Sequence, residues 1–238
     1  MVYLTYQGSS QLKMEMFFMS SIMDISLILL KGIKITLIVL VFSIIISTLI
    51  AFVAGLSRIS SNFLLNKLTG FYVEVFRGTS LIIQLFWFSY ALPGLFNIHL
   101  GSDIWTAIIA ISLNYGAYMS EIVRGSILSV SSGQTEASIA LNLSKYQRLR
   151  YIIVPQAIRM MLPEYGNYLI HILKATSLVS LIGLTDLLYY GNIYRSTHLS
   201  EAPTVYLLIL IFYFILALPL IVLTRKMEVF SKKGVAQQ

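Results

Sequence analysis

Residues 35–56 read ITLIVLVFSIIISTLIAFVAGL, a run of about 22 residues without a charged side chain. An α-helix rises about 1.5 Å per residue, so a helix of this length crosses a hydrocarbon core of about 30 Å. The stretch therefore predicts a transmembrane helix.

The composition of the whole chain also indicates a membrane protein. Its 238 residues are 57% hydrophobic and only 11% charged, and the mean hydropathy is +0.81. A water-soluble domain of this size does not need so apolar a composition to fill its core. The chain has no cysteine, so disulfides and thiolate metal sites are excluded. Its three histidines are too scattered to suggest a metal site, and a GxxxxGK[ST] phosphate loop is absent, so we expect no metal or cofactor in this chain.

Four further apolar segments predict four further spans. They lie within residues 68–92, 104–121, 152–184 and 204–223, and Pro155 and Pro163 interrupt the fourth. Residues 22–30 are apolar but too short to cross a bilayer, and Lys31, Gly32 and Lys34 separate them from the first span. The expected fold class is an all-α integral membrane protein with five transmembrane helices and a short N-terminal interfacial helix.

Basic residues orient these spans, because they accumulate in cytoplasmic loops. They gather between spans one and two, between spans three and four, and in the tail: Arg58, Lys67, Lys145, Arg148, Arg150, Arg225, Lys226, Lys232 and Lys233. Lys31 and Lys34 count against this orientation, but long side chains near helix ends can snorkel to the interface. We expect an extracytoplasmic segment at 1–21, one membrane domain at 22–228 and a cytoplasmic tail at 229–238.

The segment between spans three and four predicts a short amphipathic helix over about 133–150. Glu136 lies in its first turn, where an acid favours the helix dipole. Small and apolar residues follow, among them Ala137, Ala140 and Leu143, while the basic residues at 145–150 face water or headgroups. Such a surface suits docking against another protein on the cytoplasmic side.

This segment resembles the "EAA" loop of ABC-importer permeases. The residues that carry the resemblance are Glu136-Ala137-Ser138, Asn142 and Ile152-Ile153-Val154-Pro155, with the family's spacing throughout. Ser138, Asn142 and Val154 depart from the family's Ala, Gly and Leu. Asn is the residue next best to Gly at positive φ, so we expect a bend at Asn142 to survive this departure. The resemblance implies an ATPase-coupling helix, whose expected contact residues are Gly133, Glu136, Ala137, Ser138, Ala140, Asn142 and Leu143.

Further segments are similar to the polar amino-acid permeases of that family. They are EVFRGTSL at 74–81, GAYMSEIVRG at 116–125, and the pattern from Pro155 to Leu178 in which Ala175 replaces a common Asp or Asn. The resemblance implies a non-enzymatic subunit of the bacterial cytoplasmic membrane. Its expected partners are two ATPase subunits that bind ATP and Mg²⁺, a second permease of the same or a sibling chain, and an extracytoplasmic solute-binding protein, with no nucleic acid.

Charged residues near the ends of two spans are candidates for a cytoplasmic gate. Glu74 and Arg77 are three residues apart on one helix, as are Glu121 and Arg124, so each pair is within reach. The alternative is that these pairs only hold helices together or meet headgroups.

Polar residues nearer the middle of the bilayer are candidates for the solute pathway. Glu164 is suited to an α-ammonium group, and amide donors or Lys174 to a carboxylate. The alternative for each residue is an interhelical hydrogen bond. The candidates are Gln84, Asn114, Tyr118, Glu164, Asn167, His171 and Lys174.

Three other functions stay open. The first is a permease for another small solute, such as an opine, an ectoine or a modified sugar, because the coupling loop does not choose the cargo. The second is an intramembrane enzyme with Glu164 and His171 as an acid–base pair. The third is a passive channel or scaffold, which would not need the EAA-like spacing.

Overall fold

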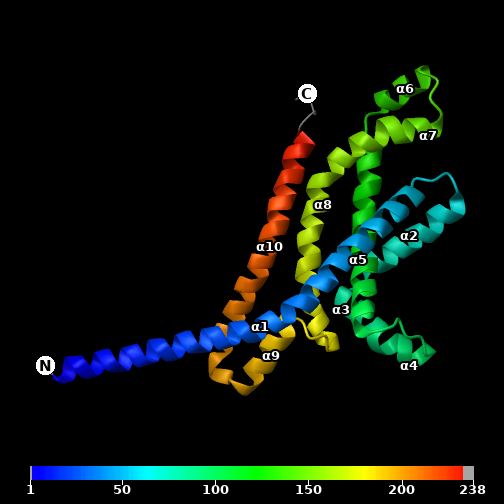
Figure 1. Ribbon diagram of the computed structural model, residues 1–238. Coiled ribbons are helices and arrows are strands. Elements are labelled where there is room, and N and C mark those ends of the chain that lie inside the picture. Colours follow the sequence, from blue (N-terminus) through cyan, green and yellow to red (C-terminus); the bar gives the residue numbers. More distant parts are fainter. Residues whose placement is uncertain (1, 233–238) are drawn as a thin grey trace.

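The computed structural model describes residues 2–232, with side chains from residue 19 onward. Within these residues every regular element is a helix, which confirms the all-α prediction. Figure 1 shows α5 (Asp103–Leu128) near the middle of the molecule, α1 (Val2–Ser57) crossing it obliquely, α8 (Val154–Thr176) beside it and α10 (Ala202–Lys232) beside α8. Residues 229–232 end α10, while Lys233 and the rest of the expected tail lie outside the described residues.

Helix α1 is continuous over Val2–Ser57. The expected break between an interfacial helix at 22–30 and the first span does not occur. At the expected break a Cβ on Gly32 would lie 2.4 Å from the backbone of Asp186, so α1 passes in close contact with a later segment there. The Thr36 hydroxyl holds the same crossing: it donates to the Gly32 carbonyl (3.2 Å) and accepts from the Leu187 amide (3.3 Å). The expected break is thus the place where α1 packs against the segment around Asp186.

Helix α5, Asp103–Leu128, forms the centre of the core. Small residues let α1 approach it closely: Gly116 lies against Ile50, and Gly55 lies against Val123. Close approach through small residues is the usual way in which helices pack in membranes, where the hydrophobic effect does not drive association.

The second predicted span is bent. Helix α2, Phe63–Gly78, ends at Thr79, whose backbone is extended (φ −117°, ψ 152°). The chain then turns by 106° into α3, a π-helical turn and α4, at Leu81–Phe86, Trp87–Ala91 and Leu92–Phe96. The span expected within 68–92 is therefore a bent pair of helical segments and not one straight helix.

The fourth predicted span is long and irregular, as its prolines suggested. It comprises α7 (Lys145–Arg148), a π-helical turn (Leu149–Ile153), α8 (Val154–Thr176) and a 3₁₀ turn (Ser177–Ile182). Pro155 stands in the first turn of α8, where its missing N–H costs little, and Pro163 lies inside the helix.

A further helix follows where the sequence predicted a loop. Gly183, with φ 87°, ends the 3₁₀ turn, and α9, Leu187–Thr197, begins at a 50° bend. The Asp186 side chain caps α9 by accepting from the Tyr189 amide (2.9 Å). After a 3₁₀ turn at Leu199–Glu201, α10 runs over Ala202–Lys232 and contains the fifth predicted span.

Two helical stretches of the described chain are long and apolar enough to cross a membrane unbroken, Met19–Ser57 and Leu199–Lys232. Two bent pairs meet the same criteria when each pair is taken together: Phe63–Gly78 with Leu81–Phe96, and Lys145–Ile182 with Leu187–Thr197. Because α5 is not among them, the count of five spans stays a prediction.

The crossing at Gly32 gives a stability test. We expect Gly32→Ala to lower the free energy of unfolding by about 1–3 kcal/mol, because the added methyl group meets backbone atoms that cannot yield. Gly70→Ala is the matched control, since no atom lies within 4 Å of a Cβ there and alanine favours a helix. Thermal unfolding in detergent measures both, and equal melting temperatures for the two variants would contradict the close packing.

Candidate functional site

The predicted coupling segment is a hairpin of two short helices. Helix α6, Ser132–Ala140, is followed by a turn, and α7 begins after Ser144 with a capping box in which Ser144 and Gln147 bond each other's backbone amides. Asn142 has a φ of 58°, which confirms the predicted bend at this departure from Gly. A single helix over 133–150 is therefore wrong, because the left-handed residue reverses the chain inside that range.

The outer surface of this hairpin is uncovered. Ile139 and Leu141 are 58% and 73% exposed. Ser138 is buried instead, and its hydroxyl donates to the Thr135 carbonyl (2.6 Å). Figure 1 shows the hairpin projecting beyond one end of the bundle. Of the other predicted contact residues, Leu143 is half-buried and the rest are exposed: Gly133, Glu136, Ala137, Ala140 and Asn142.

The last carbonyls of α2 are capped by side chains. The Val75 carbonyl accepts from the Thr79 hydroxyl (2.8 Å), and the Arg77 carbonyl accepts from the Tyr118 hydroxyl of α5 (3.1 Å). A helix end leaves such carbonyls without intrahelical partners, and in a membrane water does not replace them.

Two buried side-chain amides bond the Phe76 carbonyl, which lies between the Val75 and Arg77 carbonyls in the sequence. Gln84 of α3 and Asn114 of α5 each donate to the Phe76 carbonyl at 3.0 Å, and Asn114 also donates to the Gln84 carbonyl oxygen (3.0 Å). Gln84 donates in addition to the Thr79 hydroxyl oxygen (2.7 Å). Both residues were candidates for the solute pathway. In the structure their amide groups bond backbone at the end of α2, where the helix is interrupted.

Glu121 of α5 stands at the centre of an ion cluster. It pairs with Arg124 (Nη2 to Oε2, 3.0 Å), as predicted, and also with Arg58 at the end of α1 and Arg77 at the end of α2 (Nη1 to Oε2, 3.9 Å). The expected Glu74–Arg77 pair does not form, since Glu74 is exposed and takes part in no ion pair among the described side chains. The sequence missed Arg58 because its partner is 63 residues away.

A cleft of about 370 Å³ lies beside the capped end of α2. Aromatic rings dominate its wall: Tyr168 lies 6.1 Å from the Tyr118 ring, 6.3 Å from Tyr115 and 5.5 Å from His171, measured between ring centroids. Tyr115 and Tyr168 were not predicted as site residues, although each directly follows a predicted one in the sequence, Asn114 and Asn167. The lining residues are Thr79, Ser80, Leu81, Asn114, Tyr115, Tyr118, Tyr168 and His171.

The polar residues of α8 form an exposed stripe along one face, at Glu164, Asn167, His171 and Lys174. His171 reaches the aromatic cleft, whereas Lys174 lines a separate, mostly apolar groove between α8 and α10. Glu164 and Lys174 are ten residues apart on one helix, or about 15 Å along its axis. One small zwitterion therefore cannot bind both of these charges in a single chain.

Comparison with protein families gives a match over most of the chain. Residues 47–229 match the family described as "Binding-protein-dependent transport system inner membrane component". A probable amino-acid ABC transporter permease, y4tF of Sinorhizobium fredii, is 40% identical over 202 residues, which are 83% of this chain and 84% of the relative. The glutamine transport system permease GlnP of Escherichia coli is 34% identical over 201 residues, 84% and 91% of the two chains.

An octopine transport system permease, OccM of Rhizobium meliloti, is 42% identical over 166 residues, 67% of this chain and 68% of that one. Among solved structures, an amino acid ABC transporter crystallised with histidines superimposes with a TM-score of 0.80 at 30% identity and covers 88% of this chain and 96% of that chain. The inward-facing MetNI methionine ABC transporter superimposes with a TM-score of 0.66 at 19% identity, covering 84% and 96%, and shares the fold.

The ion cluster predicts strong coupling between Glu121 and Arg58. Because both side chains are only 19% exposed, Glu121→Gln leaves three guanidinium groups facing one another without their carboxylate. In a double-mutant cycle of Glu121→Gln and Arg58→Gln, followed by unfolding in detergent, we expect a coupling energy of about 1–3 kcal/mol. Glu74→Gln is the matched control and changes stability by less than about 0.5 kcal/mol. Additive effects of the two cluster substitutions would disprove the pairing.

Proposed function

We propose a function for this chain from one premise: it belongs to the family of binding-protein-dependent transport system inner membrane components. The resemblance seen at residues 136–155 is thereby confirmed, and the chain is a multi-pass membrane transport subunit. The proposed function is that of the permease subunit of an ATP-driven importer that moves a polar amino acid across the cytoplasmic membrane. Relatives named as amino-acid and glutamine permeases support this cargo.

The observation that carries the proposal is the uncovered hairpin of α6 and α7. Its exposed Ile139 and Leu141 are large apolar side chains on a projection that the rest of the described chain does not cover. Exposed apolar residues on such a feature are typical of a protein interface. In the proposed function this surface docks into an ATPase subunit, and Glu136 lies at the contact. Glu136 is exposed in the middle of α6 and not in its first turn, so its expected place at the helix start is wrong.

The remaining partners follow from the same reading. Two ATPase subunits bind ATP and Mg²⁺, an extracytoplasmic receptor delivers the amino acid, and this chain catalyses no reaction. A second permease, identical or a sibling, faces the stripe at Glu164, Asn167 and His171. The exposure of these residues supports that arrangement, because ionisable side chains inside a membrane face a bundle interior or a water-filled path rather than lipid.

The proposed orientation puts the hairpin and the C-terminus in the cytoplasm and the N-terminus outside. In Figure 1 the hairpin and the end of α10 lie at the same end of the molecule, whereas α4 and α9 lie at the opposite end. The basic residues Lys145, Arg148 and Arg225 belong to the first of these ends. The excess of positive charge on that side supports a cytoplasmic location.

The proposed transport cycle moves α8 through the hairpin. When the ATPases close on ATP, they push α6. The π-helical turn at Leu149–Ile153 transmits this movement to α8. The side chain of Gln156 of α8 also donates to that of Gln134 of α6 (3.3 Å). The cluster around Glu121 forms the cytoplasmic gate, because it joins the ends of α1, α2 and α5 and must open for these ends to separate. Hydrolysis then returns the pore to its inward-facing state.

A second cargo is favoured by one specific finding. The octopine permease is 42% identical to this chain, and an opine is a larger zwitterion than an amino acid. The aromatic cleft beside His171 suits either solute, because its wall combines rings with hydroxyl groups. Binding of candidate solutes to the co-encoded receptor separates the two cargoes.

Reversal of charge at Glu136 tests the coupling assignment. We expect Glu136→Lys to lower ATP-dependent uptake in proteoliposomes by at least about tenfold, the effect of a central interface residue worth about 2 kcal/mol. ATP hydrolysis should become independent of the loaded receptor, while membrane insertion stays normal.

The control for this variant is Glu228→Lys, the same charge reversal on α10 away from the hairpin, which should transport normally. Wild-type uptake by Glu136→Lys would contradict the docking site. Uptake that proceeds without ATP in the unmodified complex would instead identify a passive channel.

Removal of the Glu164 charge tests the solute pathway. We expect Glu164→Gln to lower the kcat/KM of amino-acid uptake about tenfold, because a charged hydrogen bond to the α-ammonium group becomes neutral. Glu228→Gln serves as the control and leaves uptake unchanged. The ATP hydrolysis rate without receptor separates this effect from lost coupling, and unaltered uptake at all concentrations would remove Glu164 from the pathway.

A further inference from the structure

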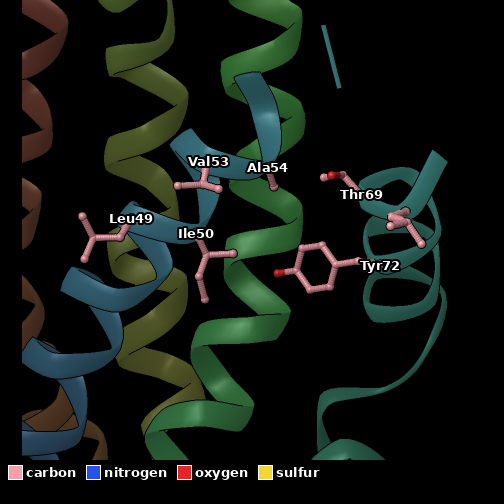
Figure 2. Close-up of a pocket in the computed structure, with 7 residues that line it drawn as sticks. Leu49, Ile50, Val53, Ala54, Thr69 and Tyr72 are labelled. Carbon is pink, nitrogen blue, oxygen red and sulfur yellow. The ribbon is translucent and has the colours of Figure 1, made fainter. Parts of the chain in front are cut away.

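An apolar groove runs between α1 and α2. Its volume is about 450 Å³, and Figure 2 shows Ile50 of α1 and Tyr72 of α2 directed toward each other. The lining residues are Leu49, Ile50, Val53 and Ala54 of α1, and Leu68, Thr69 and Tyr72 of α2.

The hydroxyl group of the one phenol in the lining already has a hydrogen-bond partner. The Tyr72 side chain reaches from α2 toward Ile50, and its hydroxyl donates to the Leu113 carbonyl of α5 (2.6 Å), so this oxygen is already bonded (Figure 2). Thr69 supplies the only other side-chain oxygen among the lining residues. The wall is therefore chemically similar to the interior of a bilayer.

Packing on α5 explains why the groove stays open. A Cβ at Gly116 would lie 2.7 Å from Ile50 and 3.3 Å from the Tyr72 hydroxyl, so both α1 and α2 already touch the same point of α5. With both helices held there, their outer surfaces diverge and leave the space between them unfilled.

One end of the groove is positively charged. Arg58 follows the lining residue Ala54 by one helical turn, and Lys67 precedes the lining residue Leu68. No acidic residue occurs in the sequence between Asp24 and Glu74. Arg58 shares Glu121 with two other arginines, and Lys67 is exposed, with its ammonium 5.6 Å from the Phe63 ring. The groove thus combines an apolar wall with an excess of positive charge at one end.

We propose that this groove binds an anionic phospholipid, with part of one acyl chain between α1 and α2 and the phosphate beside Lys67. Acyl chains are as apolar as the groove wall, so an acyl chain gains little free energy by moving from the bilayer into the groove. The preference for an anionic headgroup therefore comes from the positive charge at the end of the groove. A second copy of this chain is not the proposed occupant, because in the proposed function it faces the polar stripe on α8. The site does not depend on the transported solute.

Fluorescence quenching by brominated lipid tests the site. The full chain has two tryptophans, so a background of Trp87→Phe and Trp105→Phe lets a single new tryptophan report its surroundings. Leu49→Trp places it in the groove wall, and Val41→Trp places it on an exposed part of α1 outside the groove. Each variant is reconstituted in phosphatidylcholine vesicles with increasing amounts of phosphatidylglycerol that carries brominated chains.

The expected result is half-maximal quenching of Leu49→Trp at a mole fraction about fivefold lower than for Val41→Trp, the preference that one basic residue gives for an anionic lipid. Addition of Lys67→Gln should abolish the difference, whereas Lys145→Gln, a lysine of the hairpin, should leave it intact. Equal quenching at both positions would mean an ordinary lipid-facing surface. Absence of quenching at Leu49→Trp would mean that protein covers the groove, and persistence of the difference in Lys67→Gln would exclude the proposed headgroup contact.

Discussion

The need to bond every backbone polar group away from water shapes this molecule most clearly at the end of α2. In a bilayer a chain cannot turn by 106° unless the carbonyls released at the bend find new partners. Here side chains from the turn, from α3 and from α5 bond the carbonyls of Val75, Phe76 and Arg77. The same bonds fix Thr79 and Tyr118 in the wall of the aromatic cleft, so the repair of the backbone also shapes the candidate solute site.

The charged side chains at the neighbouring helix ends also bond one another. Glu121 pairs with arginines from three places, the end of α1, the end of α2 and its own helix, so one carboxylate joins two helix ends to α5. Three guanidinium groups around one carboxylate leave an excess of positive charge, which favours an anionic environment nearby. The contacts that hold the helix ends together therefore also make this end of the molecule attractive to anionic headgroups.

The sequence predicted features that local chemistry determines. Hydropathy was sufficient for the apolar parts of α1 and α10, and the tolerance of asparagine for positive φ was sufficient for the bend at Asn142. The break after Gly78 was missed, because neither a proline nor an asparagine marks it and its partners, Gln84 and Asn114, come from other helices. Arg58 and the cleft tyrosines were missed for the same reason: periodicity shows which face of a helix is polar, but not which distant residue it meets.

The stripe on α8 connects these features to the choice of solute. Its four polar residues are exposed in the isolated chain, and a polar face of this kind is unfavourable against lipid, so the native surroundings must supply water or another polar surface. Glu164 and Lys174 are too far apart to bind one amino acid together, and Lys174 lies in a different groove from His171. We infer that solute selection depends on the part of α8 from Glu164 to His171, beside the aromatic cleft. The α2 bend forms the other side of that cleft, so a shift of α8 changes the width of the cleft directly.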